Sequence, residues 1–512
     1  MCHRRETGRP RDRRARGRGR EHRLRRRGLR HSARGHHRRN RDVRAARRRP
    51  ARPGLFRERR GGADRPLPQR AFQEGRASRL PAHRRRGGPV RLHLGLRLRR
   101  ARLGVSGMER PVFTGSFTQQ EPIPEDGIAA AVAVMRSGRL HRYNLAPGER
   151  SETAALETEF AASVGARHCL ACASGGYAMQ LALRAWGVRA GEPVLTNAFT
   201  LSPVPGAIAA VGAEPVLVET TPDLVIDLDD LAAKAEASGA RLLLLSHMRG
   251  HIADMDALAR LLDRLGVALI EDCAHTMGAT WAGRPTGTFG AAGCFSTQTY
   301  KHVNSGEGGL LVSDDASLAA RAVVLSGSYM LYDRHEAAPP PEAFVDIRLD
   351  APNMSGRMDD LRAAILRPQL AALPKNARRW NALYAAVVEA LSGVEGLRLP
   401  HRPEAEGYVA SSIQFLCRNL AGAAADDFLA RCSGRGVDLK WFGAPEPAAY
   451  TSRHAHWRYV AAQRLPQTDA VLAGLFDMRL PLTFTVDDAG LIGRIIRESL
   501  AETRAAALMG AA

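Results

Sequence analysis

The feature that most constrains the fold is a regular alternation, from Ser151 onward, of short apolar runs with segments of helical period. Strand-length runs include "HCLACAS" (168–174), "RLLLLSH" (241–247) and "GVALIED" (266–272). Between such runs lie segments such as "DMDALARLLDRLG" (254–266), whose apolar residues fall on one helical face. Apolar strands separated by helices predict an α/β fold with a mostly parallel central sheet flanked by helices. A ligand of such a sheet lies at the carboxyl ends of its strands.

The pattern changes after a proline-rich loop near Pro340. Two helical segments follow at 358–373 and 376–391, and strands and helices are then mixed. We therefore expect a large ligand-binding domain at 108–374, including an N-terminal arm, and a smaller C-terminal α+β domain at 375–512.

Residues 1–107 differ from the rest of the chain in charge. They hold 38 Arg and no Lys against 7 acidic residues, a formal +31, so residues 108–512 carry −8 of the chain's net +23. The segment lacks apolar periodicity and is predicted to be disordered. Three interpretations are open: a basic arm for nucleic acid or an anionic surface, a targeting peptide, or an artefact of translation upstream of a start at Met108. The absence of Lys favours the artefact, and a nucleic-acid partner is not expected for the acidic remainder.

Cysteine usage and hydropathy indicate the compartment. No run of about 18 or more apolar residues is present, so a membrane location is not expected. The seven cysteines are scattered, several of them in apolar runs, which is typical of a reducing cytoplasm. Cys169 and Cys172 form a C-x-x-C pair, but no second pair completes a zinc site, so no metal is predicted.

A glycine turn is the first candidate binding site. Ser174, Gly175 and Gly176 follow a predicted strand and precede a helical segment at 177–188. The N–H groups and partial positive charge of a helix N-terminus favour an anion, phosphate above all. Because such turns are common in α/β proteins, the turn alone does not establish a phosphate site.

A carboxylate at a strand end is the second candidate. Asp272 ends the apolar run at 266–272, and His275 follows three residues later. A carboxylate at this edge needs a positive partner when it is buried, and a cationic ring nitrogen would serve. The alternative is an Asp that caps the next helix or pairs with an Arg.

A single lysine, Lys301, is the third candidate. It lies between "GCFSTQTY" and the glycines of "HVNSGEGG". A lysine held among apolar and small residues can lose its proton near neutral pH and act as a Schiff-base nucleophile. An anion cradle, a carboxylate for a ring nitrogen and an amine for an aldehyde together describe a site for pyridoxal 5'-phosphate.

The order and spacing of the motifs extend this pattern. The motifs are Ser174-Gly175-Gly176, "GEPVLTNAFTLSP", Asp272 with His275, Ser296 five residues before Lys301, and "GEGG" at 306–309. Over about residues 111–500, the chain resembles the DegT/DnrJ/StrS family of sugar aminotransferases, which are fold type I pyridoxal phosphate enzymes.

The resemblance implies transfer of an amino group from an amino acid donor, commonly glutamate in this family, to a keto sugar or keto cyclitol. Lys301 would bind the cofactor as a Schiff base and move the proton between the substrate and the cofactor. Asp272 would keep the ring nitrogen protonated, with His275 beside the ring. Ser296 and the turn at 174–176 would hold the phosphate.

The resemblance also implies a homodimer whose sites are shared between subunits through Asn353, although Arg357 follows two residues later than in the family. Two further positions depart from the family. Gly176 stands where relatives have Thr, which removes one hydroxyl donor. Leu201 stands where relatives often have an aromatic residue that stacks on the ring, and Phe199 lies nearby, so the side chain that covers the cofactor is left open.

Two other functions share the cofactor. Relatives that remove a hydroxyl from a sugar, as dehydratases or lyases, replace the lysine with histidine or add cysteines for an iron–sulfur cluster, whereas here Lys301 is present and no cluster motif occurs. A non-catalytic regulator would keep Lys301 but lose groups that hold the acceptor. Amino transfer from glutamate to a keto sugar would separate the enzyme from the regulator.

Overall fold

The computed structural model describes residues 110–510. The Arg-rich segment at 1–107 and the proposed start at Met108 lie outside the described residues, so both stay predictions. The predicted domain boundary at 374/375 falls within the described residues.

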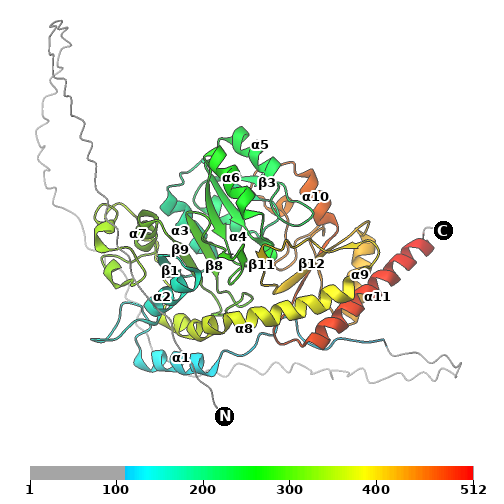
Figure 1. Cartoon of the computed structure of the whole chain (residues 1–512), viewed down its shortest axis with the longest axis horizontal. Helices are drawn as coiled ribbons and strands as arrows, with labels where there is room; N and C mark the ends of the chain where they lie inside the picture. The colour runs from blue at the N-terminus through cyan, green and yellow to red at the C-terminus, as the bar shows by residue number, and fades with distance from the viewer. Residues whose placement is uncertain (1–109, 511–512) are drawn as a thin grey trace, which may run out of the picture. The chain divides into compact units, whose positions relative to one another are not determined.

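A seven-stranded sheet forms the centre of the large domain (Figure 1), in the order β1-β9-β8-β5-β4-β2-β3. Neighbouring strands from β3 to β8 are parallel, and β9 runs antiparallel to both β8 and β1. This confirms the predicted α/β fold with a mostly parallel sheet. The strands are β1 (His168–Cys172), β2 (Pro193–Asn197), β3 (Glu214–Val218), β4 (Leu242–Ser246), β5 (Ala268–Asp272), β8 (Ala292–Ser296) and β9 (Gly309–Ser313).

Both faces of the sheet are buried. On β4, Leu242 and Leu244 pack in one hydrophobic cluster, whereas Leu243 and Leu245 pack in another. This is the alternation expected of a strand covered by helices on both sides, and it explains why the run is apolar throughout. The flanking helices of the large domain are α1 (Glu125–Ser137), α2 (Glu152–Val164), α3 (Gly175–Trp186), α4 (Pro203–Ala210), α5 (Leu228–Ser238), α6 (Met255–Leu265) and α7 (Ala316–Leu325).

One helix crosses the predicted domain boundary. The sequence predicts two helical segments, but α8 (Asp360–Leu391) is continuous through Pro368 and Pro374. Each proline removes one backbone N–H from the helix ladder, and packing against α1, α2 and α11 (Val486–Gly510) offsets that loss (Figure 1). The proposed boundary at 374/375 therefore lies inside this helix.

The smaller C-terminal domain is built on a four-stranded antiparallel sheet with the order β10-β12-β14-β13. Its strands are β10 (Leu397–Arg398), β12 (Ser412–Cys417), β13 (Lys440–Trp441) and β14 (Leu475–Arg479). Helices α9 (Ala423–Gly434), α10 (Pro466–Ala473) and α11 accompany it. A short sheet holds β6 (Thr280–Trp281), β7 (Arg284–Pro285) and β11 (Glu406–Gly407), and the 3-10 turns are η1 (Met248–Gly250), η2 (Tyr332–Arg334), η3 (Pro341–Phe344) and η4 (His454–His456).

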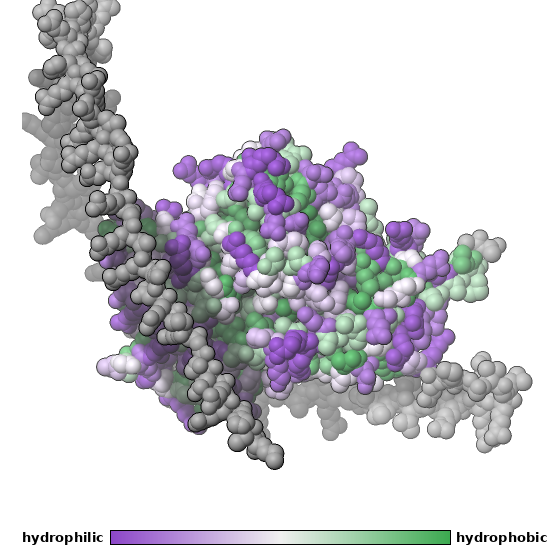
Figure 2. All heavy atoms as spheres, viewed as in Figure 1, coloured by the Kyte–Doolittle hydropathy of each residue, from purple (hydrophilic) through white to green (hydrophobic). Residues whose placement is uncertain are grey.

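The surface of the described part is mixed in polarity. Figure 2 shows hydrophilic side chains gathered at the top of the view, where Figure 1 places α5 and α6, and apolar side chains scattered among polar ones elsewhere. Within residues 110–510, none of the helices combines the length and the apolar character that a membrane crossing requires.

Candidate active site

A cavity of about 340 Å³ opens at the carboxyl ends of β1, β5 and β8, where a parallel sheet is expected to bind its ligand. Seven of the eight site residues predicted from the sequence line it: Ser174, Gly175, Gly176, Asp272, His275, Ser296 and Lys301. Only Asn353 does not. The sheet thus gathers in one place residues that are separated by up to 127 positions in the chain.

The glycine turn forms the N-terminus of α3. The Ser174 hydroxyl accepts a hydrogen bond from the backbone N–H of Tyr177 at 3.1 Å and so caps the helix. A Cβ at Gly175 would lie 2.8 Å from the Ser296 Cβ, and one at Gly309 would lie 2.3 Å from the Ser174 carbonyl oxygen. The turn therefore packs backbone to backbone against β8 and β9, which only glycine allows, and its free N–H groups stay at the cavity.

The carboxylate of Asp272 is held by its neighbours at the end of β5. Asp272 is 5% exposed, its Oδ2 accepts from the Ser246 hydroxyl at 2.7 Å, and its Oδ1 accepts from the Ala274 N–H at 3.1 Å. Ser246 ends β4 and is the register partner of Asp272 on the adjacent strand. Ser246 was not among the predicted site residues, although a hydroxyl that ends an apolar strand beside the predicted cavity is a recognisable signal.

Lys301 and His275 are in direct contact. The Lys301 Nζ lies 2.8 Å from the His275 Nε2, within hydrogen-bonding distance. Burial lowers the pKa of Lys301 to about 7, and the positive charge of Arg249 adds to this effect, whereas Asp272 opposes it. Burial, reinforced by Lys301, also lowers the pKa of His275 well below its usual value. A neutral imidazole therefore faces an amine of which about half is unprotonated at neutral pH.

Asn353 lies on an adjacent segment. Its side chain is exposed, and its Oδ1 accepts from the Ser355 N–H at 2.9 Å. The segment runs beside the glycine turn, because the Gly356 carbonyl accepts from the Ala173 N–H at 2.9 Å. Contact of Asn353 with a cofactor across a subunit interface stays a prediction.

The two candidates for covering a cofactor ring differ in their access to the cavity. Leu201 is half-buried and lines the cavity. Phe199 is 1% exposed and packs edge-on against Phe442, with ring centroids 5.2 Å apart, inside a hydrophobic cluster that Leu201 also contacts. Of these two side chains, only Leu201 is available to a ligand in the cavity.

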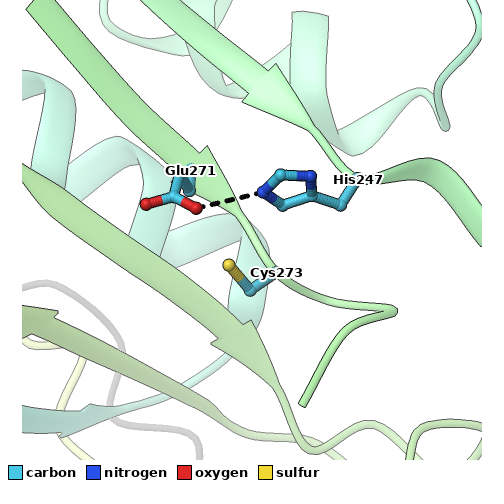
Figure 3. Close-up of side chains that lie close together, drawn as sticks. All are labelled: His247, Glu271 and Cys273. Atoms are coloured by element: carbon cyan, nitrogen blue, oxygen red, sulfur yellow. Dashed lines mark hydrogen bonds and ion pairs between the residues drawn. The ribbon is translucent and has the colours of Figure 1, made fainter. Parts of the chain in front are cut away.

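Three buried side chains, His247, Glu271 and Cys273, lie close together, and two of them flank Asp272 in the sequence (Figure 3). Glu271 accepts from the Gly287, Phe289 and Gly290 N–H groups at 2.7–3.2 Å, and its Oε2 lies 3.1 Å from the His247 Nε2. The Cys273 thiol lies beside them, with its pKa raised by burial. Because backbone donors occupy both oxygens of Glu271, its carboxylate holds the loop at 287–290 against β5.

A mostly parallel sheet that gathers a half-buried lysine, a strand-end carboxylate and a glycine-led helix N-terminus around one cavity defines the class of fold type I pyridoxal phosphate enzymes. The chain belongs to the DegT/DnrJ/EryC1/StrS aminotransferase family, whose family model matches residues 123–496. This confirms the family that the sequence motifs predicted.

Curated relatives are named as transaminases. The chain is 36% identical over 275 residues, 53% of its length and 67% of the relative's, to dTDP-3-amino-3,4,6-trideoxy-alpha-D-glucose transaminase of Streptomyces venezuelae. It is 33% identical over 279 residues to L-glutamine:2-deoxy-scyllo-inosose aminotransferase of Streptomyces fradiae, which covers 54% of this chain and 65% of that protein. The matched stretch thus spans about two thirds of each relative.

Solved structures match over more of the chain. The crystal structure of S. venezuelae DesV in complex with a ketimine intermediate is 28% identical, with a TM-score of 0.61 over 73% of this chain and 93% of that chain. The aminotransferase TlmJ from Streptoalloteichus hindustanus is 25% identical, with a TM-score of 0.64 over 76% of this chain and 99% of that chain. The described fold therefore corresponds to nearly the whole of these aminotransferases.

Proposed function

We propose that this chain binds pyridoxal 5'-phosphate and transfers an amino group from an amino acid donor to a keto sugar or keto cyclitol. The observation that carries the proposal is the half-buried Lys301 amine, with its pKa lowered to about 7, in the same cavity as the buried Asp272 carboxylate and the N-terminus of α3. The relatives named as transaminases of a sugar nucleotide and of a cyclitol support the acceptor class.

The donor groups of the cavity fit this cofactor. The N–H groups of Gly175 and Gly176 at the helix N-terminus, with the Ser296 hydroxyl, suit its phosphate. Asp272 suits its ring nitrogen, and Lys301 suits its aldehyde. When bound, the cofactor withdraws electrons from the substrate carbon that carries the migrating amino group.

The residues of the chain supply the proton chemistry. Lys301 would hold the cofactor aldehyde, and once the substrate amine had displaced it, its neutral amine would take a proton from the substrate carbon and return it on the other side of the transferred nitrogen. His275, held neutral by burial, lies 2.8 Å from the Lys301 Nζ and can orient it. Ser246 holds the Asp272 carboxylate, which keeps the ring nitrogen protonated.

Further features of the proposal follow from the family rather than from a contact in the structure. Glutamate is the proposed donor, and a cytoplasmic homodimer is the proposed state of the protein. The exposed position of Asn353, one short segment away from the glycine turn, is compatible with a contact to the cofactor of a partner subunit.

The test is an amino-transfer assay. Protein supplied with pyridoxal 5'-phosphate, glutamate and a keto cyclitol or a nucleotide-linked keto sugar is expected to release 2-oxoglutarate in an amount equal to the amino product. Omission of the keto acceptor should limit release to one equivalent per site. A protein that binds the cofactor yet releases no 2-oxoglutarate with any acceptor of these classes would be a regulator and not an enzyme.

The pH dependence of cofactor attachment provides a second test. The unprotonated amine is the nucleophile, and with a pKa of about 7 its population rises roughly tenfold from pH 6 to pH 8 and then levels off. The rate at which the cofactor-free protein takes up the aldehyde, followed by absorbance, should show this profile. The charged and titratable groups that face the amine are Asp272, which opposes the shift, His275 in contact, and Arg249, Arg479 and Lys440, which reinforce it.

A simple alkyl amine is the control for this profile. The rate at which this amine reacts with the cofactor aldehyde should keep rising well above pH 8, because the pKa of an unperturbed lysine-like amine is about 10.4. A protein profile that follows the alkyl amine would show that Lys301 is not the attacking group.

The missing hydroxyl at the glycine turn leads to a further prediction. A Cβ at Gly176 meets no atom closer than 3.9 Å, so Gly176→Thr can be accommodated and adds a hydroxyl donor beside the phosphate position. We expect the cofactor to dissociate roughly tenfold more slowly from this variant, as for one hydrogen bond to a charged group. Gly309→Ala is the matched contrast, because its Cβ would collide with the Ser174 carbonyl, and this variant should lose cofactor affinity and stability. Equal dissociation rates for Gly176→Thr and wild type would place the phosphate elsewhere.

A further inference from the structure

Lys301 lines a second, smaller cavity as well as the one at the strand ends. The smaller cavity has a volume of about 80 Å³ and lies among residues 120–124 of the N-terminal arm, residues 301–304 and the part of α8 from Gln369 to Trp380. Of the described residues that line either cavity, Lys301 alone lines both. The segment that carries the reactive amine can therefore be reached from two cavities.

Buried polar atoms in the lining of the smaller cavity have no protein partner. His302 is 5% exposed and packs edge-on against Trp380, with ring centroids 5.1 Å apart. Neither nitrogen of its ring has a hydrogen-bond partner within residues 110–510. The Nε2 atom of Gln120 is also buried and lacks a partner in the same range. Because buried polar groups are nearly always hydrogen-bonded to protein or to ordered water, these three atoms indicate a polar ligand.

The imidazole of His302 is uncharged at neutral pH. Burial, reinforced by the charge of Lys301, lowers its pKa to about 4. The carbonyl of Val409 opposes this shift, although it does not reach hydrogen-bond geometry with the ring. A neutral imidazole presents one N–H donor and one acceptor nitrogen, and the Gln120 amide adds a further donor. The lining thus needs a ligand that both donates and accepts.

Charge and volume select water as that ligand. Besides Lys301, the charged residue in the described lining is Glu121, which is exposed and pairs with Arg379 at 2.6 Å. This lining therefore holds no unbalanced carboxylate for a cation, and an anion would leave the acceptor nitrogen of His302 unpaired. Water satisfies both kinds of group, and about 80 Å³ holds several water molecules, since one needs roughly 15 Å³. The exposed Glu121 places one end of the cavity at the molecular surface.

We propose that the smaller cavity holds a short chain of water molecules, bound by His302 and Gln120, through which the Lys301 amine exchanges protons with solvent. The proposal rests on the proposed function, in which this amine carries a proton away from the substrate carbon. Cofactor and substrate would then occupy the larger cavity, which leaves the smaller one as the path for water.

Exchange leaves the charge of Lys301 unchanged. A deuteron received from the substrate carbon leaves the Lys301 nitrogen for a water oxygen, and a proton from water takes its place on the nitrogen. This exchange competes with delivery of the same deuteron to the other side of the transferred nitrogen. The share of deuterium that is delivered therefore reports how readily water reaches the amine.

Hydration of the cavity can be tested without cofactor or turnover. In deuterated water, mass spectrometry follows exchange of the hydrogen on the carbon between the two ring nitrogens of each histidine, which requires water at the ring. We expect His302 to exchange roughly tenfold or more faster than His251. His251 is the matched reference, because it is 4% exposed and its Nε2 lies 2.8 Å from the Gln414 Oε1. Exchange at His302 no faster than at His251 would show a dry cavity and overturn the proposal.

Two variants close the cavity from different sides. Ala372→Leu enlarges an apolar side chain of α8 that lines it, and Gln120→Leu replaces the unpartnered amide of the arm with an apolar group. Each should slow the exchange at His302 roughly tenfold or more, whereas Ala371→Leu, at an exposed position of α8 outside the lining, should not. If Ala372→Leu does not fold, Gln120→Leu provides the same test from the arm.

Deuterium retention tests the proton path. Glutamate deuterated at the carbon that bears the amine is converted in a single turnover, and mass spectrometry measures the deuterium delivered to the cofactor. We expect Ala372→Leu and Gln120→Leu to deliver a share of deuterium roughly twofold or more above that of wild type. Because this share is a ratio, it does not depend on the rate of turnover.

The outcomes separate the path from the proposed function. If the donor loses no deuterium with wild type, no bond to that carbon is broken and the proposed function fails, whereas the exchange at His302 still decides whether the cavity is hydrated. If the donor loses deuterium while wild type and both variants deliver the same share, the function stands and the path through the cavity is wrong.

Discussion

Lys301→Ala is expected to abolish covalent attachment of the cofactor and to lower the rate of amino transfer by a factor of about 10³–10⁴ or more. The substitution removes the amine that attacks the aldehyde and the base that moves the proton, and no other lysine of the described chain lines the cavity. Borohydride reduction of wild-type protein, followed by peptide mapping, should find the cofactor on Lys301. The same procedure applied to the variant should find it on no lysine.

Lys375→Ala is the matched control, because Lys375 is an exposed lysine on α8 away from the cavity lining. This variant should keep the covalent cofactor and wild-type transfer rates. Cofactor fixed to a lysine in Lys301→Ala protein, with activity retained, would refute the central role given to this side chain.

The sequence carried enough information to place most of the cavity because its residues follow local rules. Asp272 and Ser296 end apolar strands, and the carboxyl ends of parallel strands meet at one edge of a sheet. Gly175 lies between a strand and a helix, where close backbone packing requires glycine. Each of these positions can be inferred from its neighbours in the chain together with the topology of an α/β fold.

Other parts of the site depend on tertiary structure that local patterns do not encode. Tyr450 reaches the cavity from a loop of the C-terminal domain, about 150 residues after Lys301. The Arg249 guanidinium and the Asp477 carboxylate meet only because a turn after β4 approaches β14. The continuity of α8 was missed for a related reason, since packing against three helices outweighs the local effect of its two prolines. The positions that depend on distant parts of the chain were therefore less predictable than those proposed to hold the cofactor.

Asp272→Asn is expected to slow amino transfer by a factor of about 10²–10³ while the cofactor remains attached to Lys301. An amide is nearly the same size as the carboxylate and can still accept from the Ser246 hydroxyl, but it carries no charge to keep the ring nitrogen protonated. Single-turnover kinetics with glutamate should locate the loss in the proton-transfer step.

Ser246→Ala separates the charge of Asp272 from its orientation. This variant keeps the carboxylate and its bond from the Ala274 N–H but removes the hydroxyl donor to Oδ2, so we expect a loss of roughly tenfold or less, as for one neutral hydrogen bond. The order wild type, Ser246→Ala, Asp272→Asn in falling rate follows if charge dominates and orientation assists. A Ser246→Ala variant as slow as Asp272→Asn would mean that the position of the carboxylate matters more than its charge, and an Asp272→Asn variant as fast as wild type would mean that the ring nitrogen has another partner.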